Sequence, residues 1–205
     1  MYLVRSVSAA VAAVMLVLPG VAGAVSFGGT YVVSANGSDP GLVVQAAPGA
    51  GGFTTPDLAV GGSYTFDLFR IWTDEASVNV GEDDLARPIS VAFSFSAPGA
   101  FGGSVTGSTV GVTGPIFDRP QNGSLSWNGP VTLNFGTGGT GKVTLALTDA
   151  DFNWGLFDLK PGEKHGANVK ATLTYDVAPV PVPAALPLLL GGIGLLGAAG
   201  RRRAA

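Results

Sequence analysis

The chain has 205 residues, of which 46% are hydrophobic and 12% charged, so it can bury a core and does not have the composition of a disordered protein. It has 32 Gly and 14 Pro without a Gly-X-Y period and no Cys, which excludes collagen, disulfides, thiolate metal sites and cysteine nucleophiles. All 14 acidic residues but only 7 of the 11 basic ones lie within residues 25–178, and the resulting net charge of about −7 argues against nucleic acid as a partner.

The N-terminus has the pattern of a secretory signal peptide covering residues 1–24. Arg5 provides the positive charge, residues 7–18 form an apolar stretch, and Ala22 and Ala24 are the small residues that signal peptidase requires. The apolar stretch is shorter than a bilayer-spanning helix, which favours cleavage before Val25 over an uncleaved anchor. Everything from Val25 onward is therefore expected to cross the inner membrane.

Residues 25–178 show the pattern of short β-strands. Ile89, Val91, Phe93 and Phe95 alternate with small or polar residues, as the residues of a half-buried strand do. Other predicted strands cover residues 29–35, 42–47, 63–72, 76–80, 103–113, 124–127, 131–135, 142–148 and 168–177. Turns are predicted at Asn36-Gly37, Asn122-Gly123, Asn128-Gly129 and Gly138-Gly139.

These patterns predict one all-β domain over residues 25–178, with no long helix. About nine or ten strands between Gly, Pro, Asn and Asp turns favour an antiparallel β-sandwich, either jelly-roll-like or immunoglobulin-like. The glycine-rich interval 47–62 is expected to be a surface loop.

Catalytic patterns are absent from this domain. His165 is the only histidine and lies in a polar turn, and neither a Gly-x-Ser-x-Gly elbow nor an HExxH pair accompanies it. The protein is therefore expected not to be an enzyme. The weakest alternative is a secreted glycan hydrolase, which would need Asp149 or Asp151 about 5–9 Å from Glu75.

Two acidic clusters are candidates for calcium, the one cofactor that the sequence suggests. Asp149, Asp151 and Asn153 have the spacing that opens a calcium loop. However, Trp154 stands where an EF-hand needs glycine and Lys160 where it needs its closing glutamate, so only a looser site, or a solvated turn, is possible.

The second acidic cluster flanks the predicted strand 76–80. It consists of Asp74 and Glu75 before that strand and Glu82, Asp83 and Asp84 after it. Its carboxylates could meet around a cation, or could simply protect a sheet edge from aggregation.

Three tryptophans could contact ligands, because an indole ring packs well on the apolar face of a sugar. Trp72 and Trp127 continue apolar patterns and are expected to face the core. Trp154 lies between predicted strands and is the candidate for stacking on a ligand.

The C-terminal segment 179–205 has three parts. A proline-containing motif is formed by Val180, Pro181, Val182, Pro183 and Ala184. Residues 184–200 are uncharged and would span about 25 Å as a helix, and Arg201, Arg202 and Arg203 would hold the C-terminus in the cytoplasm. The alternative is an ordinary single-pass anchor that is never cut, for which a 17-residue span is marginal.

This arrangement resembles the PEP-CTERM class of bacterial sorting signals, in its VPLPA-CTERM variant, over about 25 residues, with Val182 replacing the usual Leu. The resemblance implies export in a Gram-negative bacterium and cutting of the tail by an exosortase. It also implies a final location at the cell surface or in the extracellular polysaccharide and biofilm matrix.

Two functions remain open for the domain itself. One is a structural or adhesive surface protein, which the absence of catalytic patterns favours. The other is a carbohydrate-binding module, which Trp154 and the polysaccharide association of the sorting family favour.

Overall fold

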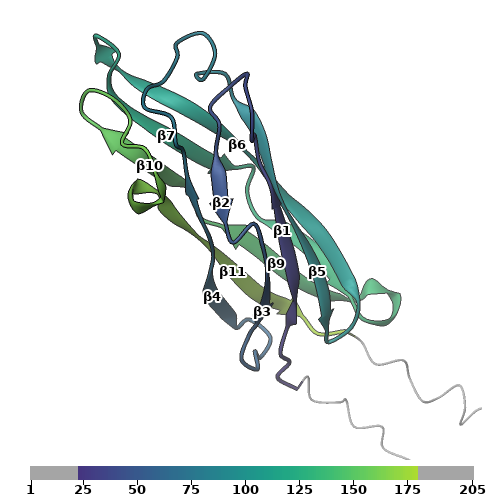
Figure 1. The fold of residues 1–205 in the computed structure, drawn as a ribbon. Coiled ribbons are helices and arrows are strands. Elements are labelled where there is room, and N and C mark those ends of the chain that lie inside the picture. Colours follow the sequence, from purple (N-terminus) through teal and green to yellow (C-terminus); the bar gives the residue numbers. More distant parts are fainter. Residues whose placement is uncertain (1–22, 180–205) are drawn as a thin grey trace, which may run out of the picture.

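The structure is a computed structural model that describes residues 23–179. Most of the predicted signal peptide, including Ala22, and the whole sorting tail from Val180 to Arg203 lie outside the described residues. Within the described part, eleven strands form two sheets in which every neighbouring pair is antiparallel, and the two sheets pack against one core (Figure 1). The predicted all-β, sandwich-like architecture is confirmed.

The first sheet has six strands. In spatial order these are β10 (Ala150–Gly155), β7 (Arg119–Trp127), β6 (Phe101–Ile116), β5 (Arg87–Ala97), β1 (Gly28–Ser34) and β3 (Ala50–Thr54). Three consecutive strands, β5, β6 and β7, lie side by side, as expected for strands joined by hairpins.

The second sheet has five strands. In spatial order these are β2 (Gln45–Ala47), β4 (Ser63–Trp72), β11 (Ala167–Val177), β9 (Gly141–Leu147) and β8 (Val131–Phe135). The helical content of the described residues is limited to two 3-10 turns, η1 (Thr137–Gly139) and η2 (Glu163–His165). Between residues 23 and 179 there is thus no helix with the length and apolarity needed to span a bilayer.

Aromatic side chains join the two sheets. The ring of Phe53 on β3 stacks on Phe66 of β4 with centroids 5.3 Å apart, and Phe101 of β6 stacks on Phe135 of β8 at the same distance. Phe27 meets both Phe135 and Tyr175 edge to face. Such pairs add about 0.5–1.5 kcal/mol each to the hydrophobic gain of burial, so this cluster stabilises the contact between the two sheets in a chain without disulfides.

Among residues 23–179, the buried hydrophobic residues lie between Phe27 and Tyr175, with Val25 and Ala178 packed against them. Val25 also forms a two-way backbone bridge with Leu58, in which both N···O distances are 2.9 Å. Both ends of the described segment therefore lie against the core.

The strand predictions were largely confirmed, and the ends of β4 and β8 match the predicted ranges 63–72 and 131–135. Four details were wrong. Residues 76–80 form a loop and not a strand, and the supposed loop 47–62 contains β3. Asn122-Gly123 lies inside β7 and not in a turn, and Trp154, expected in a loop between strands, lies in β10.

The two ends of the domain differ. The first and last described residues lie at one end in Figure 1. The hairpin between β6 and β7 and the loop that follows β10 lie together at the opposite end. This second end is called the tip.

Candidate functional site

The tip carries an exposed apolar surface. Six residues, called the tip surface, line a hollow of about 340 Å³ and are Ile116, Phe117, Arg119, Pro120, Leu156 and Phe157. Phe117 is 90% exposed, and the other three large apolar side chains are each more than half exposed. Clustered exposure of this kind marks interaction sites in soluble proteins, because it has a cost in water and adds nothing to the core.

The turn between β6 and β7 places Phe117 in an unfavourable conformation. Ile116 pairs with Arg119, so Phe117 and Asp118 form a two-residue turn, in which their φ angles are 52° and 56°. Positive φ at both positions is the type I′ arrangement, which Asn-Gly satisfies best and a bulky side chain satisfies poorly. Neither the backbone nor the core therefore requires a bulky side chain at position 117.

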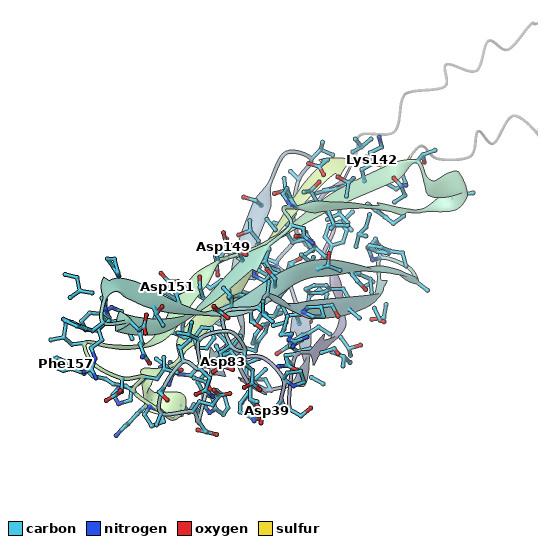
Figure 2. All side chains as sticks on the ribbon, turned by 90° about the horizontal axis from the view of Figure 1, so that it is seen from above. Asp39, Asp83, Lys142, Asp149, Asp151 and Phe157 are labelled. Atoms are coloured by element: carbon cyan, nitrogen blue, oxygen red, sulfur yellow. The ribbon has the colours of Figure 1, made fainter. Side chains whose placement is uncertain are left out.

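Two basic side chains cover aromatic rings beside this surface. The Arg119 guanidinium lies 4.8 Å from the ring centre of Phe157, which Figure 2 labels at the tip, and the Lys160 ammonium lies 5.9 Å from that of Trp154. Cation–π contacts of this geometry at exposed sites contribute about 0.5–1 kcal/mol. They hold the rings of Phe157 and Trp154 in place while leaving them open to solvent.

The sequence predicts that Trp154 is accessible and that Trp72 and Trp127 face the core, and the structure agrees only in part. Trp154 is 53% exposed on β10, so it is accessible for stacking. Trp127 is half-buried and its indole N–H donates to the Thr148 carbonyl at 3.1 Å, while Trp72 at the end of β4 is also half-buried. Neither of the latter two is fully enclosed in the core.

The structure brings together two of the three residues of the first predicted calcium cluster. Asp149 and Asp151 line one shallow hollow with Ser124 and Ser126, and both lie along the same strand region in Figure 2. Asn153 does not join them, because β10 changes register after Phe152 and the φ angle of Asn153 is 53°, which turns its side chain into the core. Its carboxamide oxygen accepts from the Thr73 amide there, at 2.9 Å.

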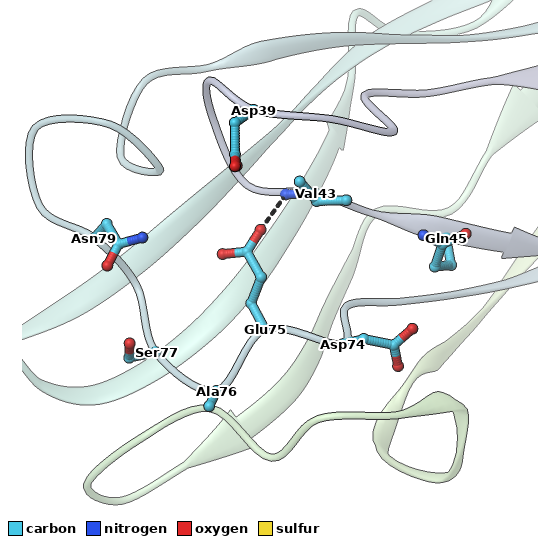
Figure 3. A pocket seen from close by; sticks show the side chains of 8 residues that line it. All are labelled: Asp39, Val43, Gln45, Asp74, Glu75, Ala76, Ser77 and Asn79. Atoms are coloured by element: carbon cyan, nitrogen blue, oxygen red, sulfur yellow. Dashed lines mark hydrogen bonds between the residues drawn. The ribbon is translucent and has the colours of Figure 1, made fainter.

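A second hollow, called the acidic hollow, has a volume of about 420 Å³. Its polar lining consists of Asp39, Gln45, Asp74, Glu75, Ser77 and Asn79. Figure 3 shows the Glu75 carboxylate reaching into it, with one oxygen accepting from the Val43 amide at 2.6 Å. Burial raises the pKa of Glu75, the Val43 hydrogen bond opposes this, and the neighbouring carboxyl groups of Asp83 and, less strongly, Asp39 raise the pKa further.

Asp83 is fully buried beside Glu75. One of its oxygens accepts from the Asn79 amide at 2.7 Å, and the other has no hydrogen-bond donor. The second predicted cluster is thus assembled in part, by Glu75 and Asp83, with Asp74 on the rim of the hollow. Asp84 is exposed and accepts instead from the Gly81 amide at 2.9 Å.

The remaining predicted groups are not assembled into a known kind of site. Among residues 23–179, no three His, Cys, Asp or Glu side chains are arranged to hold a metal ion. His165 lies partly buried in η2, and Glu75 lines a different hollow from Asp149 and Asp151. The two carboxylates that a hydrolase would need therefore do not share a groove.

Comparison with known proteins gave no match to this chain, whether with family models, curated proteins or solved structures. Its class rests on its own geometry: an all-β protein of two packed antiparallel sheets with an exposed apolar tip.

Sequence reasoning did not identify the tip surface. The sequence does contain a signal for it, which is a pair of adjacent large apolar residues followed by an aspartate. It occurs twice, as Ile116-Phe117-Asp118 and as Leu156-Phe157-Asp158. Two neighbouring side chains of a strand point to opposite faces, so an adjacent apolar pair beside a charge fits a turn better than a half-buried strand.

Proposed function

We propose that this protein is an exported cell-surface or extracellular-matrix protein, sorted by an exosortase, whose β-sandwich makes adhesive contacts through the tip surface. The observation that carries the adhesive role is Phe117, 90% exposed on a turn that disfavours it. Export and sorting rest on the sequence patterns of residues 1–24 and 179–205. A jelly-roll-like or immunoglobulin-like topology stays our prediction for the finer class of the fold.

The arrangement of the domain supports this proposal. Its last described residue, Pro179, directly precedes the sorting motif, and it lies at the end opposite to the tip (Figure 1). A domain tethered through its C-terminus, even transiently, would point the tip surface away from its own membrane. Adhesion to matrix or to another cell needs such an orientation.

The sorting half of the proposal is tested by mass spectrometry of the mature protein from cells with and without the matching exosortase. We expect the chain to begin at Val25 in both strains, and the tail after the motif to be removed only when the enzyme is present. An intact C-terminus at Ala205 in both strains would contradict exosortase sorting.

The adhesive half is tested on cells that carry the full-length protein. Replacing Phe117 and Phe157 by Ser is expected to reduce attachment to matrix from the producing bacterium at least tenfold, at unchanged surface level. Val32→Ser is the matched control, since Val32 is a 55% exposed apolar residue on β1, outside the tip surface. Equal attachment by both variants would contradict a role of the tip.

A second candidate function is carbohydrate binding, which the exposure of Trp154 favours. Its ring is 53% exposed and lies under Lys160, so one face can stack on a sugar. A glycan array with the 25–178 domain tests this, in calcium and in chelator. Binding that is lost in Trp154→Ala and kept in Phe117→Ser supports a lectin-like site, whereas loss only in Phe117→Ser supports general apolar adhesion.

A further inference from the structure

The tip surface combines a projecting side chain with a hollow beside it. Phe117 is the first residue of the two-residue turn between β6 and β7 and is 90% exposed, so its ring projects into solvent. The hollow measures about 340 Å³, and its walls, Phe117 among them, are apolar apart from Arg119. Since an enclosed cavity of about 150 Å³ can hold a benzene ring, this hollow has room for a phenyl group from outside. The same surface therefore offers both halves of a contact.

The charges around the tip surface cancel. Residues 116–120 and 156–160 contain two acidic and two basic side chains, which are Asp118, Asp158, Arg119 and Lys160. The single ion pair among residues 23–179 lies elsewhere, between β11 and β4, so none of these four charges is paired. The domain as a whole carries a net charge of about −7, which makes two copies repel each other. At the tip, two copies can meet without that net repulsion.

A surface with these properties is complementary to its own copy across a two-fold axis. In such a contact both copies use the same patch, so every favourable interaction occurs twice. The Phe117 ring of each copy enters the hollow of the other, and the acidic side chains of each copy face the basic ones of the other. A polyanionic partner lacks this match, because a tip whose charges cancel does not attract it.

We propose that the partner of the tip surface is a second copy of this protein, displayed on another cell or in the matrix. This inference rests on the proposed adhesive function and names the partner of that same surface. Pro179, the last described residue, lies at the end of the domain opposite to the tip (Figure 1). A tip-to-tip pair therefore directs its two C-terminal ends away from each other, as attachment between two facing surfaces requires.

The contact is small, so each pair is weak. Four large apolar side chains of each copy take part, whereas a stable interface has about 20–30 residues on each side. We expect dimers to form at about 10⁻⁴–10⁻³ M, at the weak end of the affinity scale. Many copies on two facing surfaces bind at the same time, and this avidity makes the attachment firm.

The experiment uses cells that carry the full-length protein, mixed with a second, differently labelled population. Cells with the unmodified protein should aggregate with each other, and roughly tenfold less with cells that lack it, because avidity requires copies on both sides. Matrix from a strain without the protein should likewise not retain them. Phe117→Ser on either population should prevent aggregation. Val32→Ser, the matched control at an exposed apolar position of β1, should not.

Two charge variants distinguish self-recognition from general apolar adhesion. Asp118→Lys with Asp158→Lys makes all four tip charges positive, and Arg119→Glu with Lys160→Glu makes all four negative. Each variant should fail to aggregate with itself, because like charges face each other, whereas a mixture of the two should aggregate. Added salt should weaken the mixture, since exposed charges hold it together. Cells that lack the protein control for unspecific adsorption of the basic variant and should stay apart from it.

Two outcomes would overturn the inference and leave the adhesive function intact. The first is equal attachment to cells or matrix that lack the protein, which would identify another partner, such as a glycan. The second is self-aggregation of both charge variants at the level of the unmodified protein. Undiminished aggregation and attachment of Phe117→Ser would instead contradict the adhesive function itself. If a charge variant does not reach the cell surface, the cells without the protein and the Phe117→Ser cells decide the question.

Discussion

Asn153 and Thr73 exchange two hydrogen bonds across the interface between the two sheets. The Thr73 amide donates to the Asn153 side-chain oxygen at 2.9 Å, and the Asn153 side-chain nitrogen donates to the Thr73 carbonyl at 3.1 Å. Asn153 belongs to β10 of the first sheet and Thr73 follows β4 of the second, and both residues are 0% exposed. The same nitrogen also donates to the carbonyls of Lys160 and Gly162, which fixes the loop leading to η2.

Asn153→Ala should therefore destabilise the domain by about 2–4 kcal/mol. The change leaves the buried amide of Thr73 without an acceptor, while the Thr73 carbonyl keeps only the Gly162 amide as donor. A buried group left unsatisfied costs more than the average hydrogen bond stabilises. Urea unfolding followed by fluorescence measures this loss. Asp151→Asn, two residues earlier and exposed, should stay within about 0.5 kcal/mol of the unmodified chain. If Asn153→Ala lowered the free energy of unfolding no more than the control does, the hydrogen bonds of Asn153 would not be needed to stabilise the contact between the two sheets.

Strand positions could be predicted where one face of a strand is buried and the other is not. In β5, every second residue is buried and its neighbours are more exposed, so the alternation of apolar and polar residues can be recognised in the sequence. The buried residues are Ile89, Val91, Phe93 and Phe95. β3 and β10 lack this signal. β3 is the glycine-rich AGGFT, with only Phe53 buried, and β10 has a register shift that places Phe152 and Asn153 both inward.

The candidate sites were predictable to different degrees. The second acidic cluster could be named from its charges, but only the fold determines that Asp83 is enclosed and Asp84 is not. The tip surface requires the β6–β7 turn and the loop after β10 to lie together, and Phe117 and Phe157 within them are 40 residues apart in the chain. Local patterns carry no information about such pairing.

Gly123 explains why an Asn-Gly pair that suggested a turn lies inside a strand. It pairs with Gly111 on one side and with Phe152 of β10 on the other. A Cβ at this position would stand 2.3 Å from the Phe152 ring, which is itself 1% exposed. Glycine thus makes room in β7 for a neighbouring aromatic side chain.

Gly123→Ala should accordingly destabilise the domain by about 1–3 kcal/mol, the usual range for overpacking a filled core. The measurement is the shift in the midpoint of urea unfolding at unchanged slope. Ser124→Ala is the control, because the adjacent residue of β7 lies partly exposed above the shallow hollow with Asp149. If both substitutions had the same small effect, the packing of Phe152 on Gly123 would be refuted.

The raised pKa of Glu75 makes the stability of the domain depend on pH. The folded state holds the proton more tightly than the unfolded state, whose pKa is near 4.5, because burial and the nearby carboxyl groups of Asp83 and Asp39 disfavour the charge. The contribution of Glu75 to the free energy of unfolding is therefore largest below pH 4.5. It is lost as the pH rises from 4.5 through the raised pKa of the folded state.

Glu75→Gln should remove that part of the pH dependence. We expect the unfolding free energy of this variant to change less between pH 4.5 and 7 than that of the unmodified chain, and to exceed it at pH 7. Denaturant titrations at a series of pH values provide the measurement, with Glu82→Gln as the control from the neighbouring loop. Parallel pH curves for the unmodified chain and Glu75→Gln would show that Glu75 does not titrate in this window.

The turn at the tip allows stability and binding to be separated. Phe117→Asn with Asp118→Gly installs the pair that a type I′ turn favours, at two positions with φ of 52° and 56°. Because a left-handed conformation costs a bulky L-residue about 1–2 kcal/mol, the double variant should be more stable than the unmodified chain by roughly 1–2 kcal/mol. It should at the same time attach less well to matrix, since the ring of Phe117 is gone.

Phe117→Asn alone tests the ring while keeping the Asp118 charge, and should lose attachment to the same degree. Increased stability with full attachment would mean that Phe117 is not a contact residue, and decreased stability would mean that the turn is not of this type.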